Sequence, residues 1–134
     1  RSINRRRWQE NDLEEALNNK DLHHGKVLST LKSLLNIRIK QPAFHPNATQ
    51  FTLHLGLQLF GFWRQSHDRK QSIFCVSNIT NQPMTLPLSE LNLIITESWI
   101  ELISKTVITE LSEEIILAPY QTVWISNKSN PSHR

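Results

Sequence analysis

A single change in the spacing of apolar residues, about one third of the way along the chain, constrains the fold most strongly. Over residues 22–40, apolar residues recur every three or four positions, which is the spacing of one face of an α-helix. From Thr49 the period falls to two, and Phe51, Leu53 and Leu55 alternate with polar residues as on a half-buried strand. A chain that changes period once should carry its helices first and a run of strands afterwards.

The helical part should hold two helices of unequal length. We expect a short helix over residues 13–19, capped by Asp12, and a long amphipathic helix over residues 22–40 that ends before Pro42. The connection 41–47, bracketed by Pro42 and Pro46, is expected to be a rigid linker. No second helix of equal length covers the apolar stripe of the long helix, so the stripe must bury against the strands or against something outside the chain. The stripe consists of Val27, Leu28, Leu31, Leu34 and Leu35, and Arg38 continues its spacing.

The second part is expected to be mainly β, as an antiparallel β-sandwich preceded by the helical segment. Turn signals separate short apolar stretches at intervals of about ten residues, and no helical pattern intervenes. Residues 57–63 are apolar on both faces and favour a central strand. Residues 91–109 are less clear, and 99–104 fit either a strand or a turn of helix. The other expected strands are 73–79, 85–88, 113–117 and 122–126.

Charge and length limit the classes of partner. The chain has 134 residues, which suits one domain or one domain with an appendage. Its formal charge is +3, but Arg1, Arg5, Arg6 and Arg7 supply four of the 15 basic residues. The rest therefore has 11 basic and 12 acidic residues, without the basic face of a nucleic-acid-binding protein. A basic interaction tail on a neutral body, with salt-sensitive binding to polyanions, stays open as one hypothesis.

Other patterns argue against a membrane protein and a cofactor. The longest apolar runs have four or five residues, so we expect no membrane span. The sequence shows no signal-peptide or transit-peptide pattern, which favours a cytoplasmic protein. It contains no P-loop or dinucleotide-binding motif and has three glycines, so no cofactor is expected. The sequons at Asn47, Asn78 and Asn127 are expected to be unmodified.

The acidic pairs are not arranged as a catalytic pair. Glu14 and Glu15 are neighbours in sequence, and so are Glu113 and Glu114. Neighbouring side chains point apart on a helix or a strand, so neither pair can flank a sugar as the two carboxylates of a glycosidase do. We expect solvated charges and no catalytic residue among them.

Histidine and cysteine also favour structural roles. His23 and His24 are adjacent at the start of the long helix, His54 lies on the polar face of a strand, and His67 lies in a turn. No Cys/His cluster or HExxH motif accompanies them, so no metal site is expected. Cys75 lies within an apolar strand and should be a small buried hydrophobe.

Three stretches together resemble one enzyme family. S-I-N-R at 2–5, L-L-N-I-R-I-K-Q-P-A-F-H-P-N-A at 34–48 and P-Y-Q-T-V-W-I at 119–125 are similar to the C-terminal end of the sucrose phosphorylase-like branch of glycoside hydrolase family 13, the α-amylase superfamily. The resemblance runs over residues 2–127. The first two stretches are fairly specific to this branch, whereas the closing strand pattern alone would be weak.

The resemblance implies a division of the chain. Residues 1–46 would be the last loop and helix of a (β/α)8 barrel, residues 47–128 the antiparallel β-sandwich C-terminal domain, and residues 129–134 are expected to be a disordered tail. Its partner would be the missing catalytic barrel, whose strands would cover the helix stripe. Arg5 would be a substrate-binding residue that donates hydrogen bonds to the hydroxyls of a glucosyl group, because barrel active sites lie at the loops that follow strands.

The resemblance also implies an activity for the full-length protein. Members of this branch transfer a glucosyl unit from sucrose or a related glucoside to phosphate, by a retaining double displacement, and form glucose 1-phosphate. Their catalytic carboxylates lie on earlier barrel strands, so this chain alone should be inactive and mainly structural. The alternative is an autonomous carbohydrate-binding β-sandwich that uses Trp63, Trp99 or Trp124 as a stacking platform.

Overall fold

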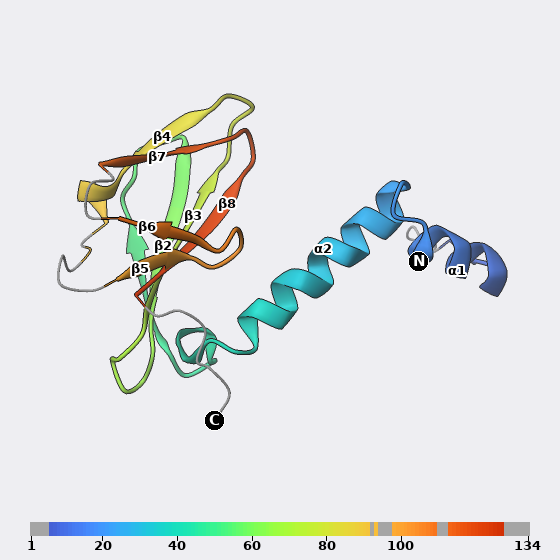
Figure 1. The fold of residues 1–134 in the computed structure, drawn as a ribbon, viewed down its shortest axis with the longest axis horizontal. Coiled ribbons are helices and arrows are strands. Elements are labelled where there is room, and N and C mark those ends of the chain that lie inside the picture. Colours follow the sequence, from blue (N-terminus) through green and yellow to red (C-terminus); the bar gives the residue numbers. More distant parts are fainter. Residues whose placement is uncertain (1–5, 92, 94–97, 110–112, 128–134) are drawn as a thin grey trace, which may run out of the picture. The chain divides into compact units, whose positions relative to one another are not determined.

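The chain forms two compact units in the computed structural model, which describes residues 6–91, 93, 98–109 and 113–127 (Figure 1). Contacts divide the chain into Arg1–Asn36, here called the helical unit, and Ile37–Arg134, here called the strand unit. The division lies ten residues before the expected domain boundary at residue 46, because residues 37–46 contact the strands. The expected disordered tail, residues 129–134, lies outside the described residues.

Two helices follow one another at the start of the chain. Helix α1 spans Glu10–Asn18 and helix α2 spans His23–Arg38, close to the predicted 22–40. The predicted Asp12 cap is wrong: the N-cap is Gln9, without a side-chain cap hydrogen bond, and Asp12 lies inside the first turn with Glu10. The sequence alone does not show whether Asp12 is the N-cap or lies in the first turn, because a carboxylate is favourable at both positions.

The apolar stripe of α2 is largely exposed. Val27 is 64% exposed, Leu31 50% and Leu35 46%. An uncovered stripe of this kind is unusual on a helix whose spacing is that of a buried face. Among the described residues, much of the stripe is therefore left without a covering element.

The strand unit is an antiparallel β-sandwich, as predicted. The β4–β7 pair lies over one face of a six-stranded sheet with the order β1-β2-β3-β8-β5-β6 (Figure 1). All the pairings described are antiparallel. The ambiguous stretch 99–104 contains a strand, β5, followed by a turn into β6. The bounds are β1 Thr49–Leu53, β2 Leu59–Gln65, β3 Ser72–Asn78, β4 Met84–Pro87, β5 Trp99–Glu101, β6 Thr106–Ile108, β7 Glu114–Leu117 and β8 Thr122–Ser126.

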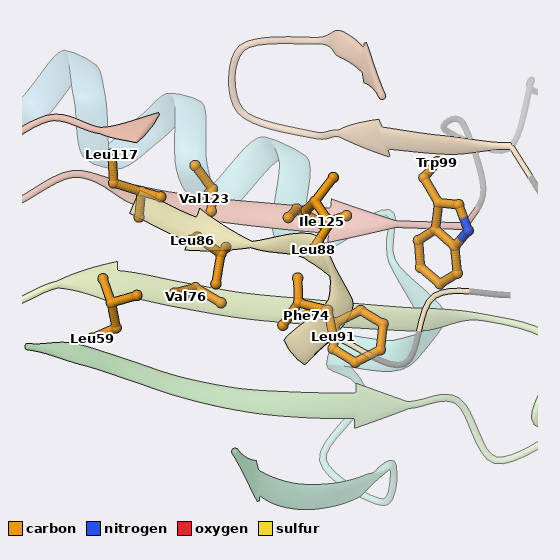
Figure 2. Packing of buried hydrophobic residues seen from close by; sticks show 10 residues of the cluster. All are labelled: Leu59, Phe74, Val76, Leu86, Leu88, Leu91, Trp99, Leu117, Val123 and Ile125. Carbon is orange, nitrogen blue, oxygen red and sulfur yellow. The ribbon is translucent and has the colours of Figure 1, made fainter. Parts of the chain in front are cut away.

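The main core lies between the two sheets. Phe74 and Val76 of the large sheet meet Leu86 and Leu117 of the small one, and all four are at most 2% exposed (Figure 2). Burial of each such side chain contributes about 1.5–3 kcal/mol. The short 3-10 turn Leu88–Glu90 closes one end of this core through Leu88.

A second, smaller core covers the opposite face of the large sheet. Ile73 and Cys75 point to this face, where they pack with Ala43 of the 3-10 turn Pro42–Phe44 and with Leu102. Strand β3 is therefore buried on both faces, the property predicted for residues 57–63. That prediction fits β2 only in part, because Leu57 precedes the strand and is 95% exposed, and Phe60 within the strand is 54% exposed.

Candidate functional site

The predicted substrate contact, Arg5, lies outside the residues that the structure describes. Its role stays a prediction. The adjoining residues, from Arg6 onward, are described and show how the basic segment is held.

An aromatic cluster holds the start of the chain against the start of α2. The guanidinium carbon of Arg6 lies 4.1 Å from the centre of the Trp8 ring, a cation–π contact worth about 0.5–1 kcal/mol at an exposed site. The edge of Trp8 meets His24 at 5.5 Å between ring centres, and His24 lies 4.0 Å from His23. This arrangement gives the polar segment next to Arg5 a defined anchor and keeps guanidinium donors at the surface.

The acidic pairs of the sequence are exposed in the structure. Glu14 and Glu15 are exposed on α1, and Glu113 and Glu114 are exposed in the strand unit. His54 and His67 are exposed too. Within residues 6–91, 93, 98–109 and 113–127, no group of three His, Cys, Asp or Glu side chains is arranged to hold a metal ion.

Cys75 is the buried thiol that the sequence predicts. It is 3% exposed, and burial raises the pKa of its thiol to about 12, although the charge of Arg64 acts in the opposite direction. The thiolate is the nucleophilic form of cysteine, so the neutral thiol of Cys75 is unreactive at physiological pH.

The three tryptophans of the strand unit pack inward and do not form a stacking platform. Trp99 is 6% exposed and belongs to the main core. Trp63 stacks on Phe74 at 5.7 Å between ring centres, and its indole nitrogen is buried without an acceptor among the described residues. Trp124 meets Phe44 edge-on at 5.0 Å. The alternative of a sugar-binding module built on these rings therefore finds no support in the structure.

A buried polar network, which the sequence did not reveal, fixes the segment after α2 to the sandwich. The Gln71 Nε2 group donates to Gln41 Oε1 at 2.7 Å and to Ser126 Oγ at 3.2 Å. Its Oε1 accepts from the Ala43 backbone N–H at 3.0 Å. We call these four residues the Gln71 clamp. The predicted rigid linker at 41–47 is thus held by buried hydrogen bonds as well as by its prolines.

Arg64 on β2 adds a second set of bonds to the same segment. Its Nε donates to the Ala43 carbonyl at 3.1 Å and its Nη2 to the His45 carbonyl at 2.6 Å. Hydrogen bonds from a charged group contribute about 1.5–3 kcal/mol. Arg64 and the Gln71 clamp together fix the path by which the chain leaves α2 and enters β1.

Glu101 is a buried carboxylate with a structural role. It is 5% exposed, and its oxygens accept from the backbone N–H groups of Ile103 at 3.1 Å, Ser104 at 2.6 Å and Trp124 at 2.8 Å. These bonds join the β5–β6 turn to β8. The carboxylate of Glu101 is therefore already engaged by the backbone.

A search for membrane-crossing helices in the described residues finds none of sufficient length and apolarity.

Comparison with known proteins gives one relative in sequence and several in structure. No protein-family model matches the chain. The glucosylglycerate phosphorylase of Allomeiothermus silvanus is 31% identical over 125 residues, which are 93% of this chain and 20% of that enzyme.

Several solved structures share the fold. AmyP in complex with maltose matches 83% of the chain with a TM-score of 0.66 at 12% identity, and 22% of that chain is covered. An Anoxybacillus α-amylase matches 75% with a TM-score of 0.63 at 16% identity, again over 22% of its length. A MutB mutant soaked with trehalulose matches 84% with a TM-score of 0.60 at 18% identity, over 19% of its length. The chain therefore spans about one fifth of each of these proteins.

Proposed function

We propose that this chain is a C-terminal domain of the type found in glycoside hydrolase family 13, and that it completes a glucosyl-transferring phosphorylase whose catalytic groups lie outside its 134 residues. One observation carries the proposal. The chain aligns over 93% of its length with a phosphorylase, at 31% identity, yet spans 20% of that enzyme. A piece of this size is suited to supporting a catalytic domain and not to replacing it.

The proposed reaction transfers a glucosyl unit from sucrose or a related glucoside to phosphate, which yields glucose 1-phosphate. A retaining mechanism needs a nucleophilic carboxylate and an acid–base carboxyl about 5–5.5 Å apart on either side of the scissile bond. In this chain, acidic pairs such as Glu14 and Glu15 are adjacent in sequence and exposed to solvent, so they do not form such an arrangement. The missing catalytic barrel would supply both carboxyl groups and bind the sugar and phosphate.

The chain would contribute to that enzyme in two ways. The exposed side chains of Val27, Leu31 and Leu35 would be covered by the barrel, and because each is already about half buried, covering the rest would contribute about 1 kcal/mol each. Arg5 would donate hydrogen bonds to hydroxyls of the bound glucosyl group through its planar guanidinium. The Trp8 cluster supports this role because it anchors the residues that follow Arg5.

A domain exchange tests the proposal. In the Allomeiothermus silvanus phosphorylase, the matching region is replaced by this chain, and formation of glucose 1-phosphate from phosphate and glucosylglycerate is compared with that of the enzyme truncated before this region. We expect activity in the chimera and none in the truncated enzyme. The isolated 134-residue chain should form no product from sucrose or glucosylglycerate. Turnover by the isolated chain would contradict the proposal that the catalytic groups lie outside this chain.

The proposed contact of Arg5 has a matched control in the same chimera. Arg5→Met should lower kcat/KM, whereas Arg7→Met, which removes an exposed arginine of the same segment, should leave it close to the unchanged chimera. Equal losses in both variants would show that the segment acts by its charge and not through Arg5.

A further inference from the structure

We propose that the strand unit forms a symmetric dimer in which β1 of one copy pairs antiparallel with β1 of a second copy. Strand β1 is the first in the order of the six-stranded sheet, and among the described residues no strand pairs with its other edge. The dimer joins the two large sheets into one continuous sheet. This interface goes beyond the proposed phosphorylase function and does not depend on it.

The open edge of β1 presents backbone hydrogen-bonding groups. The Ser66 N–H donates to the Gln71 carbonyl at 2.9 Å, in register with the pairing of β2 and β3. Bonded and non-bonded pairs alternate along an antiparallel ladder, so the odd-numbered residues of β2 point their N–H and C=O groups toward β1. Their partners in β1 are Thr49, Phe51 and Leu53. The N–H and C=O groups of Gln50 and Thr52 therefore point away from β2, to the open edge.

Strand β1 lacks the features that protect other outer strands of the two sheets. Strand β4 contains Pro87, and β7 contains Glu114. Strand β6 has only three residues and directly follows Lys105. Proline, charge and short length each discourage an outer strand from pairing with another chain. Strand β1 has five residues without a charge or a proline, so among these outer strands it is the best suited to such pairing.

A row of aromatic rings crosses the large sheet and ends at the open edge. Trp63 lies opposite Phe51 in the register of β1 and β2, and Phe74 lies opposite Trp63 in that of β2 and β3. The ring centres of Phe51 and Trp63 are 4.7 Å apart, and those of Trp63 and Phe74 are 5.7 Å apart. Phe74 then meets Trp99 at 5.7 Å. Phe51 is 43% exposed, so the row ends in a partly uncovered ring.

The sequence of β1 selects a second copy as the partner, because the strand is complementary to itself about Phe51. An antiparallel pairing centred on Phe51 places Gln50 of each copy opposite Thr52 of the other. The outward groups of both residues then form hydrogen-bonded pairs. The two Phe51 residues form the non-hydrogen-bonded pair between them, where side chains lie closest, and continue the aromatic row from one copy into the other. No charge within β1 opposes this pairing.

Sedimentation of the complete 134-residue chain at increasing concentration tests the proposal. We expect mostly monomer at about 10 µM and mostly dimer at about 1 mM, because two paired strands of this length form a small interface of the weak class. Amide hydrogen exchange at Gln50 and Thr52 should slow as the concentration rises, whereas exchange at Phe51, whose N–H already faces β2, should change less. A monomer throughout this range would overturn the proposal, and so would unchanged exchange at Gln50 and Thr52.

Variants on β1 have a matched control on β2. Phe51→Lys places two like charges side by side at the centre of the interface, and Thr52→Pro removes an N–H that faces the open edge. Each should abolish the dimer. Phe60→Lys, at another exposed phenylalanine but on β2, should dimerise as the unchanged chain does. A dimer that persists in both Phe51→Lys and Thr52→Pro would overturn the proposal.

The exposed stripe of α2 is another apolar surface through which copies can associate, and one variant separates the two. Val27→Gln/Leu31→Gln/Leu35→Gln makes the stripe polar and leaves β1 unchanged. The proposal predicts that this variant dimerises with the affinity of the unchanged chain. Loss of the dimer in this variant would show that the helices, and not the β1 edges, hold the two copies together.

Discussion

Gln71 is a buried polar side chain whose removal should lower the stability of the strand unit. It is 1% exposed, and Gln71→Met would leave the Ala43 N–H and the Gln41 amide oxygen buried without their present partner. Unsatisfied buried groups cost about 1–3 kcal/mol each, so we expect a loss of about 2–4 kcal/mol in the free energy of unfolding. Urea denaturation measures it. Gln58→Met, at an exposed glutamine, should change that free energy by less than about 0.5 kcal/mol, and equal losses in both variants would contradict the role of the clamp.

The buried thiol of Cys75 gives a prediction about reactivity and pH. Burial raises its pKa to about 12, so the folded chain should resist alkylation at pH 8 and react once it is unfolded in denaturant. Between pH 9 and about 12 the unfolded thiol loses its proton while the folded one keeps it, so stability should fall as the pH rises through this window. Cys75→Ala should show a shallower decline above pH 9 in urea unfolding. Rapid alkylation of the folded chain would contradict this assignment.

Gln71 and Cys75 also show how well the sequence predicts which single residues are buried. Cys75 was predicted to be buried because its neighbours in the strand are apolar. Gln71 was not predicted, since its partners Gln41 and Ser126 lie 30 and 55 residues away and nothing local marks a glutamine that will be buried. Arg5 was assigned through the resemblance alone and lies outside the described residues.

At the scale of elements, the spacing of apolar residues predicted whether a segment is a helix or a strand better than it predicted where the segment begins and ends. The alternation of apolar residues predicted β1, and short apolar stretches between turn signals predicted β3, β4, β7 and β8, all within one or two residues. It left the β5–β6 hairpin ambiguous, since strands of three residues are too short to establish a period. The order of strands in the sheet, with β8 between β3 and β5, depends on long-range pairing that periodicity does not encode.

The exposed stripe of α2 supports a prediction about this helix. The triple variant Val27→Gln/Leu31→Gln/Leu35→Gln should change the free energy of unfolding of the isolated chain by no more than about 1 kcal/mol, because these side chains are 46–64% exposed and glutamine is a good helix former. Circular dichroism during urea unfolding measures it. In the domain-exchange chimera, the same variant should lower thermal stability, because the proposed barrel would bury the stripe. A loss of several kcal/mol in the isolated chain would show that the stripe is already packed there.

At the scale of the whole molecule, the two units should be separable. Both apolar cores, the Gln71 clamp and the Arg64 bonds lie within Ile37–Arg134, and none of the buried groups in them comes from the described residues 6–36. Deletion of residues 1–36 should therefore leave the urea midpoint of the strand unit unchanged. The tryptophans make this measurable, since Trp8 reports on the helical unit and Trp63, Trp99 and Trp124 report on the strand unit.

The deletion of residues 1–36 needs one control, and one result would contradict the prediction. Trp8→Phe in the complete chain removes the fluorescence of the helical unit, so that its transition reports the same three tryptophans as the deleted form does. We expect coincident unfolding curves, because cooperative unfolding follows the unit that shares a core. Loss of a cooperative transition on deletion would show that the helices stabilise the sandwich directly. In that case residues 1–36 would belong to the folding unit of the strands, and the proposed role of α2 as part of a separate barrel would have to be abandoned.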